Sequence, residues 1–389
     1  MSGNSIVYIS ASVYPSVSAN SVHVARQAAA LSQKNESVEL YVCSPLSTED
    51  LLQHLCEHYG SFGKNLRLRR VWLGSVRGAT LQIALYSFFC VFFEGLFRRR
   101  EVKRVYTRNL YAAFLLAILG RKRVAYELHD IEKGFRGGIQ KLAVCSSKAH
   151  LVAISKALKS VICDIYNVAA NKVTVLHDAA DIFEDYCSEE ESLDLRKELF
   201  GAQTDRRFLV GYVGHLYSGR GIDVVAKLAE LNPDIGFFVV GGTEKDLIVC
   251  KSTFVLPNLK FVGHVSHSRA SRYTMVADCL LMPYQKNVSV GAGERDTVRW
   301  MSPMKMFEYM GSGTPFISSD LPVLREVLKD NVNCLLVSPD NIEAWNNALQ
   351  ELRRCEQQRF ELAQNAFNQL RSEHTWDKRA GAICNVISS

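Results

Sequence analysis

The sequence predicts an α/β protein with two doubly wound domains, and three observations support this fold class. The chain has 389 residues, of which 48% are hydrophobic, so it can bury two separate cores. Short apolar runs alternate with helical segments along the chain, a rhythm typical of parallel sheets covered by helices. An acidic run at 184–194 interrupts this rhythm, which restarts at Phe208.

The interruption defines the expected domain organisation. We predict an N-terminal domain over 1–185, a linker region over 186–207 and a C-terminal domain over 208–365, followed by a closing helical segment over 366–389. The apolar runs predict strands at 6–10, 38–43, 66–72, 105–108, 123–128, 150–155 and 172–176, and then at 208–213, 235–241, 259–263, 279–283, 315–319 and 334–337. Helical structure is expected over 341–371.

Composition narrows the classes of function. The net charge of +6 suits an anionic ligand or an anionic membrane surface, but no charge clustering indicates a nucleic-acid site. The eleven cysteines contain no C-x-x-C pair, and most lie in apolar runs, which favours reduced, buried thiols in a cytoplasmic protein. No secretory signal is recognised at the N-terminus, and the two histidines at 264 and 267 lack the further ligands that zinc would need.

The segment 79–97 is the most apolar stretch, and basic residues follow it up to Arg104. Gln82, Glu94 and Gly95 weaken a transmembrane reading. An apolar helix beside a basic cluster can lie in the interface of an anionic membrane. Two interpretations stay open: a peripheral contact through 79–104 at the inner face of the membrane, or an ordinary core helix.

The stretch 302–320 predicts an anion site. Ser302 followed by Pro303 indicates a helix start, with Ser302 as the N-cap, and glycines after the last turn end the helix. The free N–H groups of a helix start attract an anion, and Lys305 in the first turn adds a positive charge. Glu308, one turn later, can accept two hydrogen bonds from a vicinal diol. Phosphate donors beside a diol-binding acid describe a nucleotide site.

Two further places carry polar residues at the carboxyl ends of predicted strands, where ligands of open α/β sheets bind. After 208–213 comes a loop with Gly214, Gly219 and Gly221, in which glycines allow close approach to a diphosphate and Arg220 supplies charge.

The other place follows 123–128, where the string ELHD brings His129 and Asp130 to a strand end. Arg108 and Asn109, at the end of the preceding strand, are candidates for contact with an acceptor phosphate. The GFRGG segment at 134–138 is predicted to be a mobile loop. Near the N-terminus, we expect Asn20 or Ser21 to cap a helix and His23 to be solvated.

The segment SPMKMFEYMGSGTPFISSDLPVLREV resembles the donor-binding helix of the family 4 glycosyltransferases, which have the two-domain GT-B fold. The resemblance covers nearly the whole chain and implies two Rossmann-like domains facing a cleft. It implies that Glu308 holds the ribose of a UDP- or GDP-sugar, and that Lys305 and Arg220 hold its diphosphate. It places Gly214, His215 and Gly241 at the nucleotide and His129 at the transferred sugar.

This sequence departs from the family pattern at one informative position. The family commonly carries a glutamate eight residues before the position of Glu308, and Trp300 stands there instead. That acid is usually directed at the transferred sugar, so the identity of the sugar stays open. Glu294 or Asp296 are possible substitutes. The chain has no D-x-D pair, so no metal ion bridging the diphosphate is expected, and no cofactor beyond the donor substrate.

Together these patterns predict a retaining glycosyltransferase that moves a hexose-type sugar to a saccharide or lipid-linked acceptor, in surface polysaccharide or lipopolysaccharide biosynthesis. His129, Arg220 and Lys305 are the predicted catalytic residues. A non-catalytic sugar-nucleotide-binding protein and a GT-B-fold epimerase remain alternatives, although an epimerase needs an acid–base set and only His129 and Asp130 suggest one. A membrane-surface scaffold built on 79–104 is a third.

Overall fold

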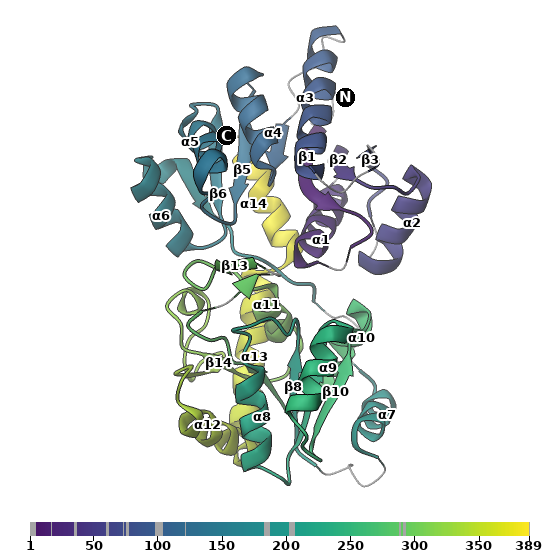
Figure 1. Ribbon diagram of the computed structural model, residues 1–389, viewed down its shortest axis with the longest axis vertical. Helices are drawn as coiled ribbons and strands as arrows, with labels where there is room; N and C mark the ends of the chain where they lie inside the picture. Colours follow the sequence, from purple (N-terminus) through teal and green to yellow (C-terminus); the bar gives the residue numbers. More distant parts are fainter. Residues whose placement is uncertain are drawn as a thin grey trace. The chain divides into compact units, whose positions relative to one another are not determined.

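A computed structural model describes most of the chain (Figure 1). The described residues are 5–16, 18–34, 37–59, 62–72, 74, 78–97, 104–120, 122–182, 187–201, 207–287, 289–290 and 293–388, with only the backbone described for 93–97, 289–290 and 293–296. The basic residues Arg98, Arg99, Arg100 and Lys103, and the side chains of Glu294 and Asp296, therefore lie outside the described part. Two compact units are present, one from Met1–Asp178 with Trp376–Ser389, and one from Ala179–Thr375.

The N-terminal unit is built around a seven-stranded sheet with the order β3-β2-β1-β4-β5-β6-β7, in which all neighbouring strands pair in parallel. The strands are β1 (Ser5–Val13), β2 (Ser37–Cys43), β3 (Leu66–Val71), β4 (Arg104–Thr107), β5 (Val124–Leu128), β6 (Ala149–Ala153) and β7 (Val173–Val175). The order reverses between β1 and β4, so the carboxyl ends of these strands border the position where such sheets bind ligands.

Helices connect the strands of this unit, as parallel pairing requires. They are α1 (Ala19–Gln33), α2 (Thr48–Tyr59), α3 (Ala79–Phe97), α4 (Leu110–Phe114), the π-helical turn η1 (Leu115–Leu119), α5 (Gly134–Cys145), α6 (Lys156–Tyr166) and the 3₁₀ turn η2 (Ala170–Lys172). The C-terminal helix α14 (Trp376–Ser388) also belongs here. In Figure 1 its yellow ribbon runs beside β5 and α1, and it packs on α1, β4 and β5.

The C-terminal unit contains a six-stranded parallel sheet with the order β10-β9-β8-β11-β14-β15. Its strands are β8 (Leu209–Val213), β9 (Gly236–Val240), β10 (Leu259–Gly263), β11 (Cys279–Met282), β14 (Phe316–Ser319) and β15 (Leu335–Val337), and β12 (Ser289–Val290) and β13 (Gly293–Asp296) form a separate antiparallel pair. The helical elements are α7 (Glu189–Phe200), α8 (Ile222–Leu231), α9 (Glu244–Thr253), α10 (His267–Val276), α11 (Met304–Gly311), the 3₁₀ turn η4 (Leu324–Glu326), α12 (Ile342–Arg354) and α13 (Glu356–Glu373). Here the strand order reverses between β8 and β11.

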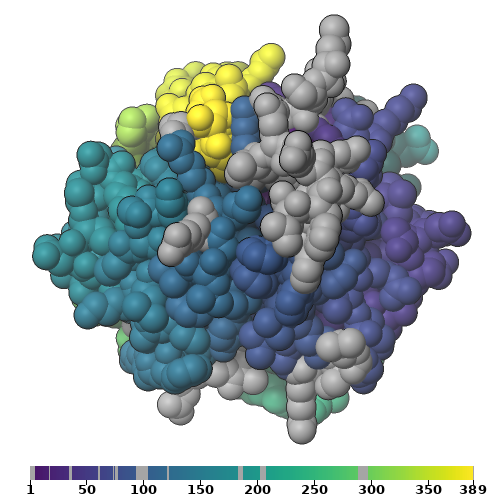
Figure 2. All heavy atoms as spheres, turned by 90° about the horizontal axis from the view of Figure 1, so that it is seen from above, coloured from purple at the N-terminus to yellow at the C-terminus, as the bar shows by residue number. Residues whose placement is uncertain are grey.

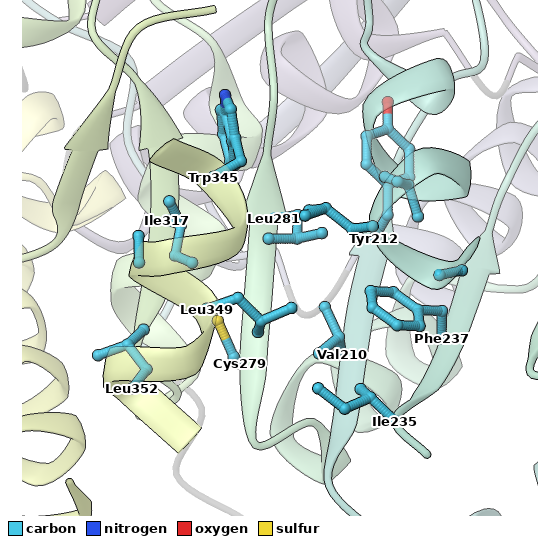
Figure 3. Packing of buried hydrophobic residues seen from close by; sticks show 14 of the residues in the cluster. Val210, Tyr212, Ile235, Phe237, Cys279, Leu281, Ile317, Trp345, Leu349 and Leu352 are labelled. Atoms are coloured by element: carbon cyan, nitrogen blue, oxygen red, sulfur yellow. The ribbon is translucent and has the colours of Figure 1, made fainter. Parts of the chain in front are cut away.

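The core of this unit explains why its strands read as continuous apolar runs. Both faces of a parallel sheet are covered by helices, so successive side chains are buried on opposite sides. Val210, Leu281 and Ile317, from three neighbouring strands, belong to one buried cluster with Trp345 and Leu349 of α12 (Figure 3). All five side chains are fully buried. This packed layer holds the carboxyl ends of β8 and β11 in fixed positions.

The predicted fold class is confirmed, because both units are doubly wound α/β structures with parallel sheets. Two local expectations were wrong. The acidic run, expected to be an exposed linker region, is largely helical: Ser188 and Glu191 form a capping box that starts α7, whose N-terminal turn is stabilised by acidic side chains. Arg269 and Arg272 of α10 pair with Glu198 and Glu191 of α7, which places this helix in the C-terminal unit.

The GFRGG segment is the second of these corrections. It forms the first turns of α5, where Arg136 pairs with Glu132 just ahead of the helix. The predicted helical structure over 341–371 is confirmed, as the two helices α12 and α13, which Cys355 with its extended backbone separates. None of the helices in the described part of the chain is long and apolar enough to cross a membrane.

Candidate functional site

The loop after β8 lies where the strand order reverses, and the side chain of Lys305 packs against its backbone at Gly214. Gly214 has a φ of +148°, and a Cβ atom there would lie 2.4 Å from Cε of Lys305. Only glycine therefore lets the Lys305 side chain cross this position. Gly221, at the end of the same loop, has a φ of +81°, and a Cβ there would lie 1.9 Å from the carbonyl oxygen of Pro283.

Lys305 is a buried cation without a hydrogen-bond acceptor. Its side chain lies on α11 and the residue is 9% exposed, yet no acceptor among the described residues reaches its ammonium group. Nζ lies 3.6 Å from the centre of the Tyr212 ring and 5.6 Å from that of Tyr284. Burial, together with nearby Arg220, holds the pKa of Lys305 well below its usual value. The ammonium group is therefore stabilised by two aromatic rings and not by an anion.

Arg220 also lies against the Tyr284 ring, and we call Lys305 and Arg220 together the Tyr284 cation pair. Its Nη1 donates a hydrogen bond to the Tyr284 hydroxyl at 2.9 Å, and its guanidinium carbon lies 5.0 Å from the ring centre. Nε of Arg220 is buried and has no acceptor in the described part of the chain. Two cations with unused donors and one shared aromatic partner are an arrangement that a diphosphate would complete.

Helix α11 begins one residue later than the sequence predicted. Pro303 occupies the N-cap position and makes no side-chain capping hydrogen bond, so the expectation that Ser302 is the cap was wrong. Ser302 is buried just ahead of the helix. Proline fixes the backbone angle that leads into the helix but offers no side-chain acceptor. The N-cap residue of α11 therefore does not compete with an anion for the first N–H groups of the helix, close to Lys305.

Hydrogen bonds of Tyr309 tie α11 to β8 and β11. The Tyr309 hydroxyl accepts from the Val213 N–H at 2.8 Å and lies 3.4 Å from the carbonyl oxygen of Leu281. The helix that carries Lys305 is therefore anchored to both strands at the reversal. Glu308, one turn after Lys305, is 28% exposed, and its Oε1 lies 3.9 Å from Nδ1 of His267. Its carboxylate faces an accessible position on the same helix as Lys305.

His215 and Gly241 support the loop in different ways. The His215 ring stacks on Tyr217 with centres 5.0 Å apart, and burial together with Arg220 and Lys305 lowers the pKa of His215 to about 4. His215 is thus neutral at physiological pH and can offer hydrogen bonds but no charge. Gly241 has a φ of +114°, and a Cβ there would lie 2.2 Å from the Gly214 carbonyl oxygen, so it shapes the loop around Gly214.

In the N-terminal unit, His129 lies at the end of β5 and is held on both ring nitrogens. Its Nε2 lies 2.6 Å from Oε1 of the fully buried Glu127, and its Nδ1 lies 3.2 Å from Nη2 of Arg108. The His129 side chain is 28% exposed, so one face of the ring can meet a ligand. Burial and Arg108 lower the pKa of His129, which keeps the ring neutral.

The other residues expected at this edge have structural roles. Asn109 is fully buried: its amide donates to the carbonyls of Ser10 and Thr80, and its oxygen caps α4. It cannot contact an acceptor phosphate, so that expectation was wrong. The cap of α1 is Ser18, not Asn20 or Ser21.

His23 was expected to be solvated but is 1% exposed. It lies 3.4 Å from Oε1 of Glu127, and its Nδ1 lies 3.0 Å from Oδ1 of Asp178. It belongs to a buried cluster that includes Glu127 and Asp178 and packs against His129.

With this geometry described, the comparison with protein families is informative. Residues 197–369 match the family described as glycosyl transferases group 1, and this range lies within the C-terminal unit and contains the Tyr284 cation pair. This region of the chain is therefore similar to the glycosyl transferases of group 1. Among the residues that the structure describes in and around this region, no three His, Cys, Asp or Glu side chains gather so that they could hold a metal ion.

The chain also resembles individual proteins. An uncharacterized glycosyltransferase of Methanocaldococcus jannaschii is 24% identical over 244 residues, which are 61% of this chain and 59% of the relative, so the match spans about three fifths of the relative's length. HepE of Anabaena, solved in complex with UDP, has a TM-score of 0.71 at 17% identity over 99% of both chains. WaaG, a glycosyltransferase involved in lipopolysaccharide biosynthesis, has a TM-score of 0.63 at 12% identity over 99% of this chain and 100% of that one. These likenesses establish the GT-B fold.

Sequence reasoning missed Tyr212 and Tyr284, whose rings lie against Lys305, and the buried residues next to His129. Tyr212 lies inside β8, one residue before its end, and Tyr284 lies two residues after β11, so a tyrosine near the carboxyl end of a buried strand was the available signal. Glu127 is a carboxylate inside the otherwise apolar strand β5, which also was a signal. Nothing in the sequence pointed to Arg379.

Proposed function

We propose that the protein is a retaining glycosyltransferase that uses a UDP- or GDP-sugar. The observation that carries the proposal is the Tyr284 cation pair near the start of α11: a buried ammonium and a guanidinium with unused donors, in a region that matches the glycosyl transferases of group 1. A buried cation without an acceptor destabilises the protein, and binding of an anion removes this destabilisation. A nucleoside diphosphate carries the required charge, and complexes of HepE with UDP and UDP-glucose make uridine the first base to test.

The chemistry follows from where charge develops during transfer. Breaking the bond between the sugar and the diphosphate leaves negative charge on the departing phosphate oxygens. Lys305, Arg220 and the N–H groups at the start of α11 stabilise that charge without moving, which lowers the barrier to bond breaking. We assign Glu308 to the ribose diol, Ser302, Pro303 and the loop from Gly214 to the phosphates, and Gly241 to the base edge. His129 is assigned to the reacting sugar.

Release of nucleoside diphosphate from donor sugars tests the proposal. The purified protein is incubated with UDP- and GDP-sugars, with and without EDTA, and the freed UDP or GDP is measured. We expect release from one donor, unaffected by EDTA, and lost in Arg220→Met. Lys227→Met, which removes an exposed lysine paired with Glu230, is the matched control and is expected to behave as wild type. Release by Arg220→Met at the wild-type rate would refute the assignment.

The acceptor is proposed to be a saccharide or lipid-linked intermediate of surface polysaccharide or lipopolysaccharide biosynthesis, with contact to an anionic membrane through 79–104. The support is one face of α3, where Leu81, Leu85, Phe89 and Phe92 recur every three or four residues and are 41–52% exposed, while the opposite face packs on β1 and β2. Figure 2 looks onto this unit, and blue atoms of this region of the chain lie at its surface. Large exposed apolar faces beside basic sequence suit the membrane interface.

Vesicle flotation tests this part separately. We expect binding to vesicles that contain anionic lipid, weak binding to neutral ones, and loss of binding in the double variant Leu85→Glu with Phe89→Glu. Phe360→Glu, at an exposed apolar position on α13, is the control and is expected to bind normally. Equal binding by both variants would contradict the contact.

A further inference from the structure

The hydrogen bonds around His129 define which ring nitrogen carries the proton. Arg108 can only donate, so Nδ1 of His129 is the acceptor in the 3.2 Å contact. The proton of the neutral ring is therefore on Nε2, and this N–H donates to Oε1 of Glu127 at 2.6 Å. A ring fixed in this way presents the same edge and the same charge to every ligand.

Glu127 is held in turn by Arg379, which comes from the far end of the chain. Nη2 of Arg379 donates to Oε2 of Glu127 at 2.7 Å. The remaining donors of Arg379 bind Gln27 at 2.6 Å through Nη1 and the carbonyl of His177 at 2.9 Å through Nε. Arg379 is 4% exposed. The guanidinium therefore connects α14 to α1 and to the carboxyl-terminal part of β5, and each of its nitrogen atoms has a hydrogen-bond partner.

The charges of this buried cluster balance only when Arg379 is present. Two carboxylates, Glu127 and Asp178, face two guanidinium groups, Arg108 and Arg379, and the hydroxyls of Tyr8 and Tyr106 complete the surroundings. Burial would raise the pKa of Glu127, but Arg379 and His129 lower it to about 2. Burial, Arg108 and Arg379 hold the pKa of His23 well below its usual value, so both histidines are neutral. Without Arg379 the cluster carries a net negative charge, which a histidine proton would neutralise.

We propose that Arg379 is a positioning residue for His129, acting through Glu127, and that the C-terminal helix α14 is therefore part of the reacting site. This inference rests on the proposed function in its assignment of His129 to the sugar. It goes further by giving a functional role to a residue that lies 250 positions away from His129 in the sequence. A helix that packs on the sheet for stability alone would need no buried arginine at this position.

Two substitutions separate position from charge. Arg379→Gln removes the charge and keeps a polar side chain, whereas Arg379→Lys keeps the charge and loses the three-way hydrogen bonding. Asp377→Asn is the matched control, because Asp377 pairs with Lys34 of α1 from the same helix but on its exposed side. Full-length variants are compared by the ¹⁵N shifts of the His129 ring, assigned with His129→Asn, by kcat and donor KM, and by the pH dependence of kcat.

In wild type and Asp377→Asn we expect the His129 ring to stay neutral, with its proton on Nε2, to a lower pH than an exposed histidine. In Arg379→Gln the pKa of the His129 ring is expected to rise, with the acid limb of kcat moved upward and kcat reduced about tenfold or more. Arg379→Lys keeps the pH profile of wild type but loses several-fold in kcat, with an unchanged donor KM. Wild-type ring shifts and pH profile in a folded Arg379→Gln variant would overturn the inference.

If Arg379→Gln does not fold, the kcat of Arg379→Lys becomes the test of the inference. A wild-type kcat in that variant would overturn it. The ring shifts need no turnover, so they test the role of Arg379 even if the protein transfers no sugar. A wild-type protein that releases no nucleoside diphosphate while His129 responds to Arg379→Gln would refute the transferase proposal alone.

Discussion

Replacing Lys305 with methionine should stabilise the empty protein while it weakens nucleotide binding. The lysine is 9% exposed and its ammonium has no acceptor in the described residues, a situation that costs about 1–3 kcal/mol. Its contact with the Tyr212 ring, 3.6 Å away, offsets about 0.5–2 kcal/mol of this cost. Methionine fills a similar volume without a charge, so we expect a net gain of about 1 kcal/mol.

That gain corresponds to a rise in Tm of about 2–4 °C for a unit of this size, measured by scanning calorimetry without ligand. The gain should be largest at low pH and should shrink as pH rises toward 10. The reason is that the pKa of Lys305 is lowered in the folded protein, so raising the pH removes the buried charge and its cost. Nucleotide affinity, measured by titration calorimetry, should fall by roughly 10- to 150-fold through loss of a charge-assisted hydrogen bond worth about 1.5–3 kcal/mol.

Lys227→Met is again the control and should change neither Tm nor affinity. A lower Tm in Lys305→Met, with nucleotide affinity unchanged, would refute the reasoning, because it would mean that the ammonium is satisfied within the protein and has no anion to bind.

Three other outcomes follow from the same geometry. Gly214→Ala should weaken nucleotide binding at least tenfold in calorimetry, because its Cβ would lie 2.4 Å from Cε of Lys305, whereas Gly138→Ala, with open space around the new Cβ, should not. Nucleotide binding should take up protons, since the diphosphate raises the lowered pKa of Lys305, so titrations in buffers of different ionisation enthalpy should give different heats and affinity should fall as pH rises. Glu308→Ala should bind UDP and 2′-deoxy-UDP equally, whereas wild type should prefer UDP; an unchanged preference would exclude Glu308 from the ribose.

The fold was largely predictable, because parallel strands buried on both faces are continuous apolar runs in the sequence, and such runs can be recognised without knowing which strands pair. The pair Ser188 and Glu191 was a sequence signal for a helix start that the acidic composition of the run hid, whereas the pairing of this helix with α10 was not visible in the sequence. The helix start at Pro303 was missed by one residue, because a Ser-Pro pair does not specify which residue turns into the helix.

Much of the candidate site was also accessible from the sequence, and the rest depended on contacts across long distances in the chain. Lys305, Arg220 and Glu308 were selected by local motifs that the structure places on adjoining elements. The neutral state of His215 and the burial of His23 arise from neighbours that no motif records. The pairing of Arg379 with Glu127 joins residues 252 positions apart and could come only from the folded chain.

The central claim is that the Tyr284 cation pair binds a nucleoside diphosphate. Thermal shift of the wild-type protein against UDP, GDP and ADP, each with and without EDTA, tests it most directly, with Lys305→Ala and Glu308→Ala beside it. The account predicts that one nucleotide raises Tm, that EDTA leaves the shift unchanged and that both variants lose it. A well-folded wild-type protein whose Tm no nucleotide changes would contradict the claim.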